Sequence, residues 1–486
     1  MYLGIDVGTS SVKALLIDDA QSVVGTASAP LEVSRPQPGW CEQAPADWWM
    51  ATQVVIGALK RSCPKQIAAI EGIGLSGHMH GATLLGKAGE VLRPCILWND
   101  GRSATECVEL EAACPRLREI AGNIAMAGFT APKLLWVKKN EPVIFAKVAK
   151  VLLPKDYVRL LMTGEYASEM SDSAGTLWLD VGKRDWSDEL LAATSLTRDH
   201  MPKLYEGSAP TGRLRADIAT AWGMTKRPVV AGGGGDNAAS ACGIGAVKPG
   251  TGFLSLGTSG VLFVSNARFS PNTAGAVHAF CHAIPNTWHQ MGVILSATGS
   301  LEWLSGVLGE PVPSLMAAIG DDIGVPSPVK FLPYLSGERT PHNDPAARGV
   351  FAGLGHDSDR ATLTRAVIEG VAFAVRDCQE ALKAAGTDIG TLMAVGGGSR
   401  AKLWLRIIAT LLDKPLNLPA HAEAGGAFGA ARLGMAAATG ADPVAICAAP
   451  PVTETIEPAR QHRAAYEAAY QRYRRLYPAI KEVMSP

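Results

Sequence analysis

The chain has 486 residues, of which 47% are hydrophobic and 19% are charged, and this length predicts two domains of about 200–250 residues each. Its 45 basic residues balance its 45 acidic residues, which argues against a nucleic-acid or membrane-surface partner. Nine scattered cysteines without a Cys-x-x-Cys pair argue against a zinc site or a disulfide framework and favour a cytoplasmic protein.

Apolar stretches of strand and helix type alternate along the first half. They predict strands at residues 2–6, 12–18, 22–33, 67–77 and 96–100 and a helix at residues 45–60. Thr130 is expected to cap a helix that has Pro132 in its first turn and runs to residue 139. The half closes on RPVVAGGGGDN (227–237), a strand that breaks into four glycines and an acid.

The second half repeats this order of elements. Strands are expected at residues 252–265 and 392–399, helices at 361–382 and 401–412, and a loop at 331–341. This alternation favours an α/β fold in which mixed sheets carry helices on both faces. Turn residues and a change of composition near residues 240–252 predict two domains, residues 1–245 and 246–486.

Tyrosines recur at helical spacing among arginines near the C-terminus, at positions 466, 470, 473 and 477. Such a stripe could stack on RNA, but a helix that docks its tyrosines on the body of the protein is the favoured alternative. We therefore expect no nucleic-acid partner.

Two stretches, one in each half, share a Gly-Thr-Ser tip between apolar runs: GIDVGTSSV (4–12) and LSLGTSGV (254–261). Each is typical of a hairpin whose turn offers backbone N–H groups and hydroxyls. The pair predicts a duplicated domain that grips one anion from both sides. Glycines at residues 232–235 and 396–398 would also let a backbone approach a phosphate closely. No stretch fits the P-loop pattern or the dinucleotide-binding glycine pattern.

The first hairpin carries an acid, Asp6, where the second has Ser255. A lone carboxylate would repel a phosphate unless a cation lay between them, so we expect Asp6 to hold Mg²⁺, which commonly binds one carboxylate, waters and phosphate oxygens. A capping aspartate in a turn is the alternative. Asp236 follows the four glycines and precedes Asn237, and we expect it to accept the proton of a substrate hydroxyl in phosphoryl transfer.

A further group of polar residues lies in SGHMHGATLL (76–85), after another predicted strand end. Alternate spacing would turn His78 and His80 the same way, as in a metal pair, but no third ligand lies nearby in the sequence. Hydrogen bonding of His80 to a polyol is favoured instead. In WNDGR (98–102), Asp100 and Arg102 are as suited to pairing with each other as to touching a substrate.

Taken together, these residues resemble the FGGY carbohydrate kinases, of the actin, Hsp70 and sugar kinase superfamily. GFTAPKLLWVKKN (128–140) matches the family's first signature. GVFAGLGHDSDRATLTRAVIE (349–369) resembles the second, with Thr362 where an acid, amide or histidine is usual, a residue that could still cap a helix. GWCEQAPADWW, ILWNDGR, LLPKDY, PYLSGERTP and GGGSR are also similar, so the resemblance covers nearly the whole chain. The glycine run before Asp236 is one residue longer than usual.

The resemblance implies two ribonuclease-H-like domains with a cleft between them, the sugar on the first and ATP mostly on the second. It implies that Asp236 is the catalytic base and that Asp6 is the acid needed near Mg²⁺. The residues expected to contact the sugar are Met79, His80, Asp236 and Asn237, and those expected to face ATP are Thr9, Ser10, Lys13, Gly257, Thr258, Gly397 and Gly398. Because the resemblance is greatest to the group that acts on D-xylulose, the implied reaction is ATP-dependent formation of D-xylulose 5-phosphate in pentose catabolism.

Three other interpretations stay open on the sequence. A kinase of the same family for ribulose, glycerol or gluconate would share these motifs. An actin-like or Hsp70-like ATPase would share the paired hairpins but would not need Asp236 or the Met79–His80 pair. A nicotinamide dehydrogenase is the weakest alternative. We expect a cytoplasmic enzyme without a membrane partner, which could form a homodimer.

Overall fold

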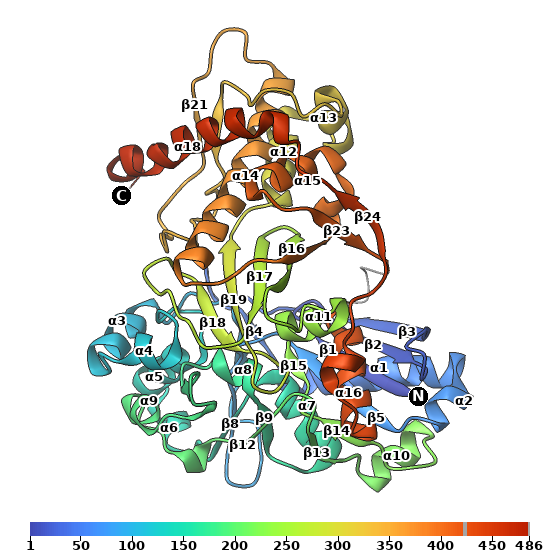
Figure 1. The fold of residues 1–486 in the computed structure, drawn as a ribbon. Helices are drawn as coiled ribbons and strands as arrows, with labels where there is room; N and C mark the ends of the chain where they lie inside the picture. The colour runs from blue at the N-terminus through green and yellow to red at the C-terminus, as the bar shows by residue number, and fades with distance from the viewer. Residues whose placement is uncertain (421–424, 485–486) are drawn as a thin grey trace.

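The computed structural model describes residues 1–420 and 425–484. Its framework is a pair of seven-stranded mixed sheets, one from each half of the chain (Figure 1). In the first sheet the strand order is β13 (Pro210–Arg213), β14 (Val229–Ala231), β5 (Gly72–Gly77), β1 (Tyr2–Val7), β2 (Ser11–Ile17) and β3 (Val23–Pro30), and β15 (Gly234–Gly235) also pairs with β5. In the second the order is β18 (His278–Cys281), β19 (Trp288–Ile294), β17 (Gly260–Asn266), β16 (Thr251–Leu256), β22 (Thr391–Val395), β23 (Leu416–Pro419) and β24 (Val452–Ile456).

Small two-stranded sheets and helices complete the described structure. The small sheets pair β4 (Glu42–Gln43) with β7 (Cys95–Ile96), β6 (Thr83–Leu85) with β8 (Lys150–Leu152), β9 (Ala167–Glu169) with β12 (Lys203–Tyr205), β10 (Leu179–Asp180) with β11 (Asp185–Trp186) and β20 (Lys330–Leu332) with β21 (Val350–Ala352). The α-helices are α1 (Pro45–Ser62), α2 (Pro64–Ala68), α3 (Ala104–Ala113), α4 (Leu117–Ala121), α5 (Thr130–Asn140), α6 (Pro142–Phe145), α7 (Pro154–Thr163), α8 (Met170–Ala174), α9 (Asp188–Ala193), α10 (Ala216–Trp222), α11 (Asp236–Ile244), α12 (Thr298–Leu308), α13 (Val312–Ile319), α14 (Arg360–Ala384), α15 (Lys402–Leu412), α16 (Gly425–Thr439), α17 (Pro443–Ile446) and α18 (Arg463–Met484). Short 3₁₀ helices are η1 (Arg198–His200), η2 (Gly397–Arg400) and η4 (Arg460–His462). Within the described ranges, no helix has both the length and the apolar character needed to cross a bilayer.

The two predicted hairpins occupy equivalent places in the two large sheets. β1 pairs antiparallel with β2 and parallel with β5, and β16 pairs antiparallel with β17 and parallel with β22. Both β1 and β16 are mostly buried along their length, as strands inside a sheet covered by helices are. The duplicated hairpin that the sequence predicts is therefore confirmed, together with the α/β fold and its mixed sheets.

Several sequence predictions are wrong in local detail, among them the strand predicted at 96–100, which is only the short β7 because a turn follows at Trp98. Thr130 does not cap α5, because Phe129 holds the N-cap position and Thr130 Oγ1 donates to the backbone oxygen of His80 at 3.2 Å. Asp359, and not Thr362, caps α14: its Oδ1 accepts from the Thr362 N–H and hydroxyl, both at 2.8 Å, and its charge suits the positive end of the helix dipole. The strand predicted at 67–77 begins only at residue 72, because α2 precedes it.

One helix of the second half packs on the sheet of the first half. Figure 1 shows α16 beside β1, β5 and α11, and it contacts all three. Glycines make this approach close, since a Cβ added at Gly4 or Gly74 would lie 1.8 Å from a backbone oxygen of α16. The chain thus returns from the second sheet to the first near its end. The predicted bounds, residues 1–245 and 246–486, assign α16 to the second domain although it packs on the first sheet. The domain bounds therefore stay a prediction.

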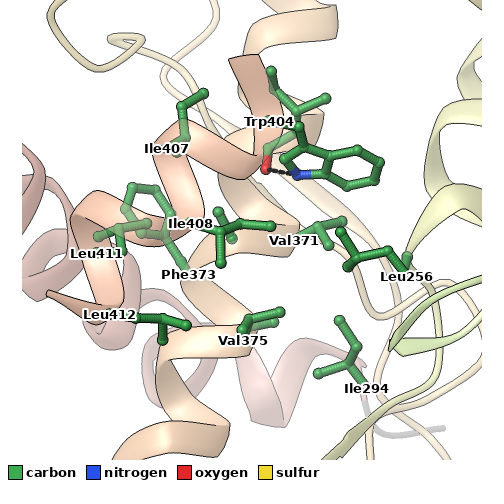
Figure 2. Packing of buried hydrophobic residues seen from close by; sticks show 14 of the residues in the cluster. Leu256, Ile294, Val371, Phe373, Val375, Trp404, Ile407, Ile408, Leu411 and Leu412 are labelled. Atoms are coloured by element: carbon green, nitrogen blue, oxygen red, sulfur yellow. Dashed lines mark hydrogen bonds between the residues drawn. The ribbon is translucent and has the colours of Figure 1, made fainter. Parts of the chain in front are cut away.

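The core of the second half lies between its sheet and two helices (Figure 2). Leu256 and Ile294 of the sheet share one buried cluster with Val371 of α14 and Ile408 of α15. Trp404 is buried in the same cluster, and its Nε1 donates to the backbone oxygen of Ile368 at 2.9 Å. A buried indole N–H usually finds such a partner.

The C-terminal helix α18 docks on this core through its tyrosines. Tyr466, Tyr470, Tyr473 and Tyr477 are all buried. The hydroxyl of Tyr470 donates to Asp377 at 2.7 Å, and that of Tyr473 lies 3.2 Å from the hydroxyl of Tyr334. The stripe therefore faces the protein, which confirms docking as the role of these rings.

Candidate active site

The ends of three neighbouring strands meet at one edge of the first sheet. β1 and β15 both pair with β5, so that Asp6 and Gly234 lie on opposite sides of Ser76. Parallel strands end at the same edge, where sites in such sheets form. Asp236 follows β15 directly, and residues 78–80 follow β5. The structure therefore brings together the two acids and the His-Met-His stretch that the sequence singles out.

Four glycines carry the chain along the edge of β5 to Asp236. β14 ends at Ala231, and the chain rejoins the sheet as β15. Between them Gly233 has φ of 77°, and a Cβ there would lie 2.0 Å from the backbone oxygen of Leu75. Only glycine fits such a position. Two glycines form the break between β14 and β15 and two form β15 itself, which accounts for the length of the run.

Asp6 carries a buried oxygen that lacks a donor. Its Oδ1 atom is buried and has no hydrogen-bond partner among the described residues, although Ser76 lies beside it in register. Burial raises the pKa of Asp6, whereas the Ser76 hydroxyl and its cross-strand neighbour Lys13 lower it. The start of α16 closes over this acid, because a Cβ on Gly426 would lie 3.2 Å from Asp6 Oδ1. A buried carboxylate oxygen without a hydrogen-bond donor is suited to binding a cation.

The open side of the first hairpin is lined by Thr9, Ser10 and Lys13. Ser10 and Lys13 are exposed and Thr9 is partly buried. Trp98 reaches this turn from the WNDGR motif: its Nε1 donates to Thr9 Oγ1 at 3.0 Å, while 50% of the residue stays exposed. Gln43 Nε2 donates to the backbone oxygen of Thr9 at 2.7 Å. The hairpin tip is thus fixed from one side and open on the other.

Asp236 is the first residue of α11, and its two carboxylate oxygens differ in their hydrogen bonds. Its Oδ1 accepts from the backbone N–H of Asn237 at 2.7 Å and from Asn237 Nδ2 at 2.9 Å. No hydrogen bond to its Oδ2 occurs in the described structure. Burial raises the pKa of Asp236 to about 6; the Asn237 hydrogen bonds oppose this rise and the Asp6 carboxylate adds to it. Asp236 is therefore ionised at neutral pH, close enough to Asp6 to interact with it, and able to accept a proton.

Met79 and His80 lie against two glycines, Gly235 and Gly175. A Cβ on Gly235 would lie 3.0 Å from Met79 Cγ, and one on Gly175 would lie 2.7 Å from His80 Cε1. His80 Nδ1 is 2.7 Å from the backbone oxygen of Gly175. Because a carbonyl only accepts, Nδ1 carries the hydrogen and Nε2 keeps its lone pair. Burial lowers the pKa of His80 to about 3, so the ring is neutral.

The second half presents its glycines on the opposite sheet. Thr258 is exposed at the tip of the β16–β17 hairpin, and its backbone oxygen accepts from Ala297 N at 2.7 Å at the start of α12. Gly397 opens η2 with free space beside its Cα, whereas Gly398 is buried against Leu256. An open pocket of about 420 Å³ adjoins η2; it is lined by Ala394, Gly396, Gly397, Ser399, Arg400, Lys402, Leu418 and Pro419.

The other polar residues singled out by the sequence motifs make structural contacts. His78 packs edge-on against Trp48 with ring centroids 5.5 Å apart, and burial lowers the pKa of His78 to about 3. His78 thus packs against Trp48, whereas His80 contacts the backbone oxygen of Gly175. Asp100 and Arg102 form an ion pair at 2.7 Å, and both are almost fully buried. In the part of the chain that the structure describes, no group of three or more His, Cys, Asp or Glu side chains is placed to hold a metal.

Three residues around the site are absent from the sequence predictions: Gly426, Trp98 and Lys133. Lys133 Nζ donates to the backbone oxygen of His80 at 3.0 Å from inside the protein. A lysine one helical turn after Thr130, among apolar residues, is the only local signal for this buried amine. No local pattern could place Gly426 beside Asp6, because the contact joins opposite ends of the chain.

Comparison with known proteins extends over the whole chain. The model of the N-terminal domain of the FGGY family of carbohydrate kinases matches residues 1–243, and that of its C-terminal domain matches residues 252–438. The xylulose kinase of Escherichia coli (strain K12) is 48% identical over 487 residues, with 100% of each chain covered. Two solved structures are also similar: a xyloylose kinase from Brucella ovis (60% identity, TM-score 0.98) and a xylulose kinase from Rhodospirillum rubrum (28% identity, TM-score 0.91), each covering 99% of both chains.

These matches agree with the architecture and with the motifs read from the sequence. They confirm the predicted fold of two ribonuclease-H-like halves as found in sugar kinases. An actin-like filament protein or a dehydrogenase is no longer an alternative. The chain belongs to the FGGY family of carbohydrate kinases.

Proposed function

We propose that this carbohydrate kinase transfers the γ-phosphoryl group of ATP to the 5-hydroxyl of D-xylulose, giving D-xylulose 5-phosphate and ADP. One observation carries the proposal: a free carboxylate oxygen, a neutral imidazole and a thioether converge at one strand edge, in a chain 48% identical over its full length to a kinase named for xylulose. The carboxylate suits phosphoryl transfer to a hydroxyl, and the relatives' names favour the sugar.

Asp236 serves as the general base in this proposal. Its Oδ1 is held by Asn237, which leaves Oδ2 to accept the proton of the 5-hydroxyl. As the O5–H bond breaks, O5 bonds to the γ-phosphorus, and the bond from that phosphorus to the bridging oxygen of ATP breaks. The electron pair leaves on ADP, and the proton stays on Asp236 until water removes it. The raised pKa of Asp236, about 6, fits a base that works near neutral pH.

Met79, His80 and Asn237 orient the sugar in this proposal. The Met79 thioether offers an adaptable apolar surface to the carbon chain. His80 Nε2 accepts a hydrogen bond from a sugar hydroxyl, since Nδ1 already donates to Gly175. Asn237 uses its amide N–H on Asp236 and keeps its side-chain oxygen for a second hydroxyl. This combination suits an uncharged ketopentose.

ATP is held between the two hairpins in this proposal. Thr9, Ser10, Lys13, Gly257 and Thr258 face its phosphates, and Gly397 and Gly398 lie against the nucleoside. Asp6 would hold Mg²⁺, and the unpartnered Oδ1 fits this cation, which commonly takes one carboxylate and otherwise waters and phosphate oxygens. When bound, Mg²⁺ neutralises charge on the phosphate oxygens.

An ATP-consumption assay across a panel of sugars tests the assignment. We expect kcat/KM for D-xylulose to exceed that for ribulose, glycerol and gluconate. Preference for another of these sugars would replace the substrate and leave the kinase reaction intact. ATP turnover that no sugar stimulates would contradict the reaction itself.

The cellular location and the assembly of the enzyme are further expectations from the sequence. We expect it to act in the cytoplasm without a membrane or nucleic-acid partner, and a homodimer is one assembly to test. Size-exclusion chromatography with light scattering would distinguish a dimer from a monomer.

A further inference from the structure

The backbone of His80 adopts a conformation that needs support. Its φ is +71°, in the left-handed region that residues with a Cβ rarely occupy. The ring contacts Gly175 through Nδ1 and packs edge-on against Phe129 at a centroid distance of 4.5 Å, and both contacts depend on where the His80 backbone places the ring. Neither contact with the ring holds the peptide group that follows His80. Another part of the chain must hold it.

Two side chains of α5 supply this support. Thr130 Oγ1 donates to the His80 backbone oxygen at 3.2 Å, and Lys133 Nζ donates to the same oxygen at 3.0 Å. The residues lie three apart on one face of the helix, so both reach one acceptor. The His80 oxygen thus accepts two hydrogen bonds from one rigid element.

Lys133 is unusual because its amine is buried without a carboxylate partner. It is 0% exposed, and within the described ranges the His80 oxygen is its only hydrogen-bond acceptor and no ion pair reaches it. The charge of Asp100 favours a higher pKa for Lys133, but Asp100 itself forms an ion pair with Arg102. Burial lowers the pKa of Lys133 to about 7. Burying an amine is costly, so an aliphatic side chain would serve better if the position only filled space.

We infer that Lys133 is a positioning residue of the sugar site: through the backbone oxygen of His80 it holds the imidazole in the one orientation that presents Nε2 to a sugar hydroxyl. Full burial keeps Lys133 from touching the sugar or ATP itself. The inference rests on the proposed function only in taking His80 as a sugar contact. Its effect is confined to sugar binding, because Lys133 contacts His80 and no residue expected to face ATP.

Lys133→Met tests this role, since methionine keeps the length of the chain and removes the donor. We expect KM for the preferred sugar to rise about ten- to hundredfold, the loss that a hydrogen bond to a buried group typically represents, while KM for ATP stays within about twofold. Lys138→Met is the matched control, because Lys138 lies on the same helix, is exposed and donates to Ser195. It should change neither constant. Thr130→Val provides a second variant that keeps the side-chain shape and should raise KM for the sugar by a smaller factor.

A double-mutant cycle separates positioning from general damage. If Lys133 acts only through His80, then His80→Ala combined with Lys133→Met should be no worse for sugar KM than His80→Ala alone. Additive effects would overturn the inference, as would an unchanged sugar KM in Lys133→Met or an equal rise in Lys138→Met. Parallel rises in the KM for ATP would also overturn it.

Nitrogen NMR of the ¹⁵N-histidine-labelled protein without sugar gives a readout independent of the substrate. In the wild type we expect His80 as the single tautomer with hydrogen on Nδ1, and in Lys133→Met a mixture of tautomers. An unchanged tautomer would contradict the positioning role even if the substrate were correctly assigned. A wild type that prefers another sugar would refute D-xylulose, and the cycle repeated with that sugar would still decide the role of Lys133.

Discussion

The two Gly-Thr-Ser hairpins have one backbone plan and different side chains. In the first, Asp6 lies beside Ser76 on the parallel strand and Lys13 on the antiparallel strand. In the second, Ser255 takes the place of the acid and lies beside two valines, Val395 and Val261. An acid, a cation and a hydroxyl in one copy are thus replaced by a hydroxyl and two apolar residues in the other.

This difference indicates how a duplicated fold can divide its work. Both turns keep backbone N–H groups and hydroxyls at an exposed tip, which is all that a phosphate needs. Only the first copy adds the groups that we propose bind a cation or move a proton, and Asp236 and His80 emerge beside it. The second copy is backed by the hydrocarbon core of Figure 2. The first half would therefore perform the chemistry, while the second would hold the nucleotide.

The largest effect should follow removal of the proposed base. Asp236→Asn should lower kcat by about 10²–10⁴, the usual contribution of a positioned base, because the amide cannot accept the hydroxyl proton. Binding of a nonhydrolysable ATP analogue, measured by calorimetry, should be retained, since we propose that the second half holds most of ATP. Turnover near the wild-type rate would contradict the division of work.

The pH profile should report the contact between the two acids. As the proposed base, Asp236 must be ionised to act, and its raised pKa is about 6, so kcat/KM should fall as pH drops through 6 and be about tenfold lower at pH 5 than on the plateau. Asp6→Asn removes a negative neighbour that raises this pKa, so the acid limb should move to lower pH. An acid limb at the same pH in both proteins would show that the two acids do not interact.

The smallest effect should appear in the core of the second half. Trp404→Phe removes the hydrogen bond to the Ile368 backbone oxygen and leaves space beside a smaller ring, so it should lower the free energy of unfolding by about 1–3 kcal/mol. Urea unfolding measures this loss, and kcat should stay within about twofold. Trp303→Phe, at a partly exposed site, is the control and should cost less than about 0.5 kcal/mol. A large fall in kcat in Trp404→Phe would mean that this core does more than support the sheet.

Much of this organisation could be predicted because local patterns encode it. Alternating apolar runs and glycine tips predict the hairpins, and four glycines followed by an acid mark Asp236. Contacts between distant segments could not be predicted in this way. The packing of α16 on the first sheet and the approach of Gly426 to Asp6 depend on the path of the whole chain.

The direction of some side chains could not be predicted from the sequence either. Thr130 has the residue type and place of a helix cap, yet tertiary structure turns its hydroxyl to His80. The same helix face carries Lys133 inward, where its charge alone would place it in water. Thr130 and Lys133 both depart from the placement that local sequence predicts. Both lie at the candidate site, where conflicts between local preference and tertiary structure are expected.

The most direct test compares the two hairpins at the one position where they differ. Asp6→Asn and Ser255→Ala should be assayed side by side with D-xylulose, ATP and a range of Mg²⁺ concentrations. We predict that Asp6→Asn lowers kcat by about 10²–10³, a loss typical of one preorganised electrostatic group, and that excess Mg²⁺ restores little, whereas Ser255→Ala stays within about threefold of the wild type. Equal losses in the two variants, or an unchanged Mg²⁺ dependence in Asp6→Asn, would contradict the assignment of the chemistry to the first hairpin.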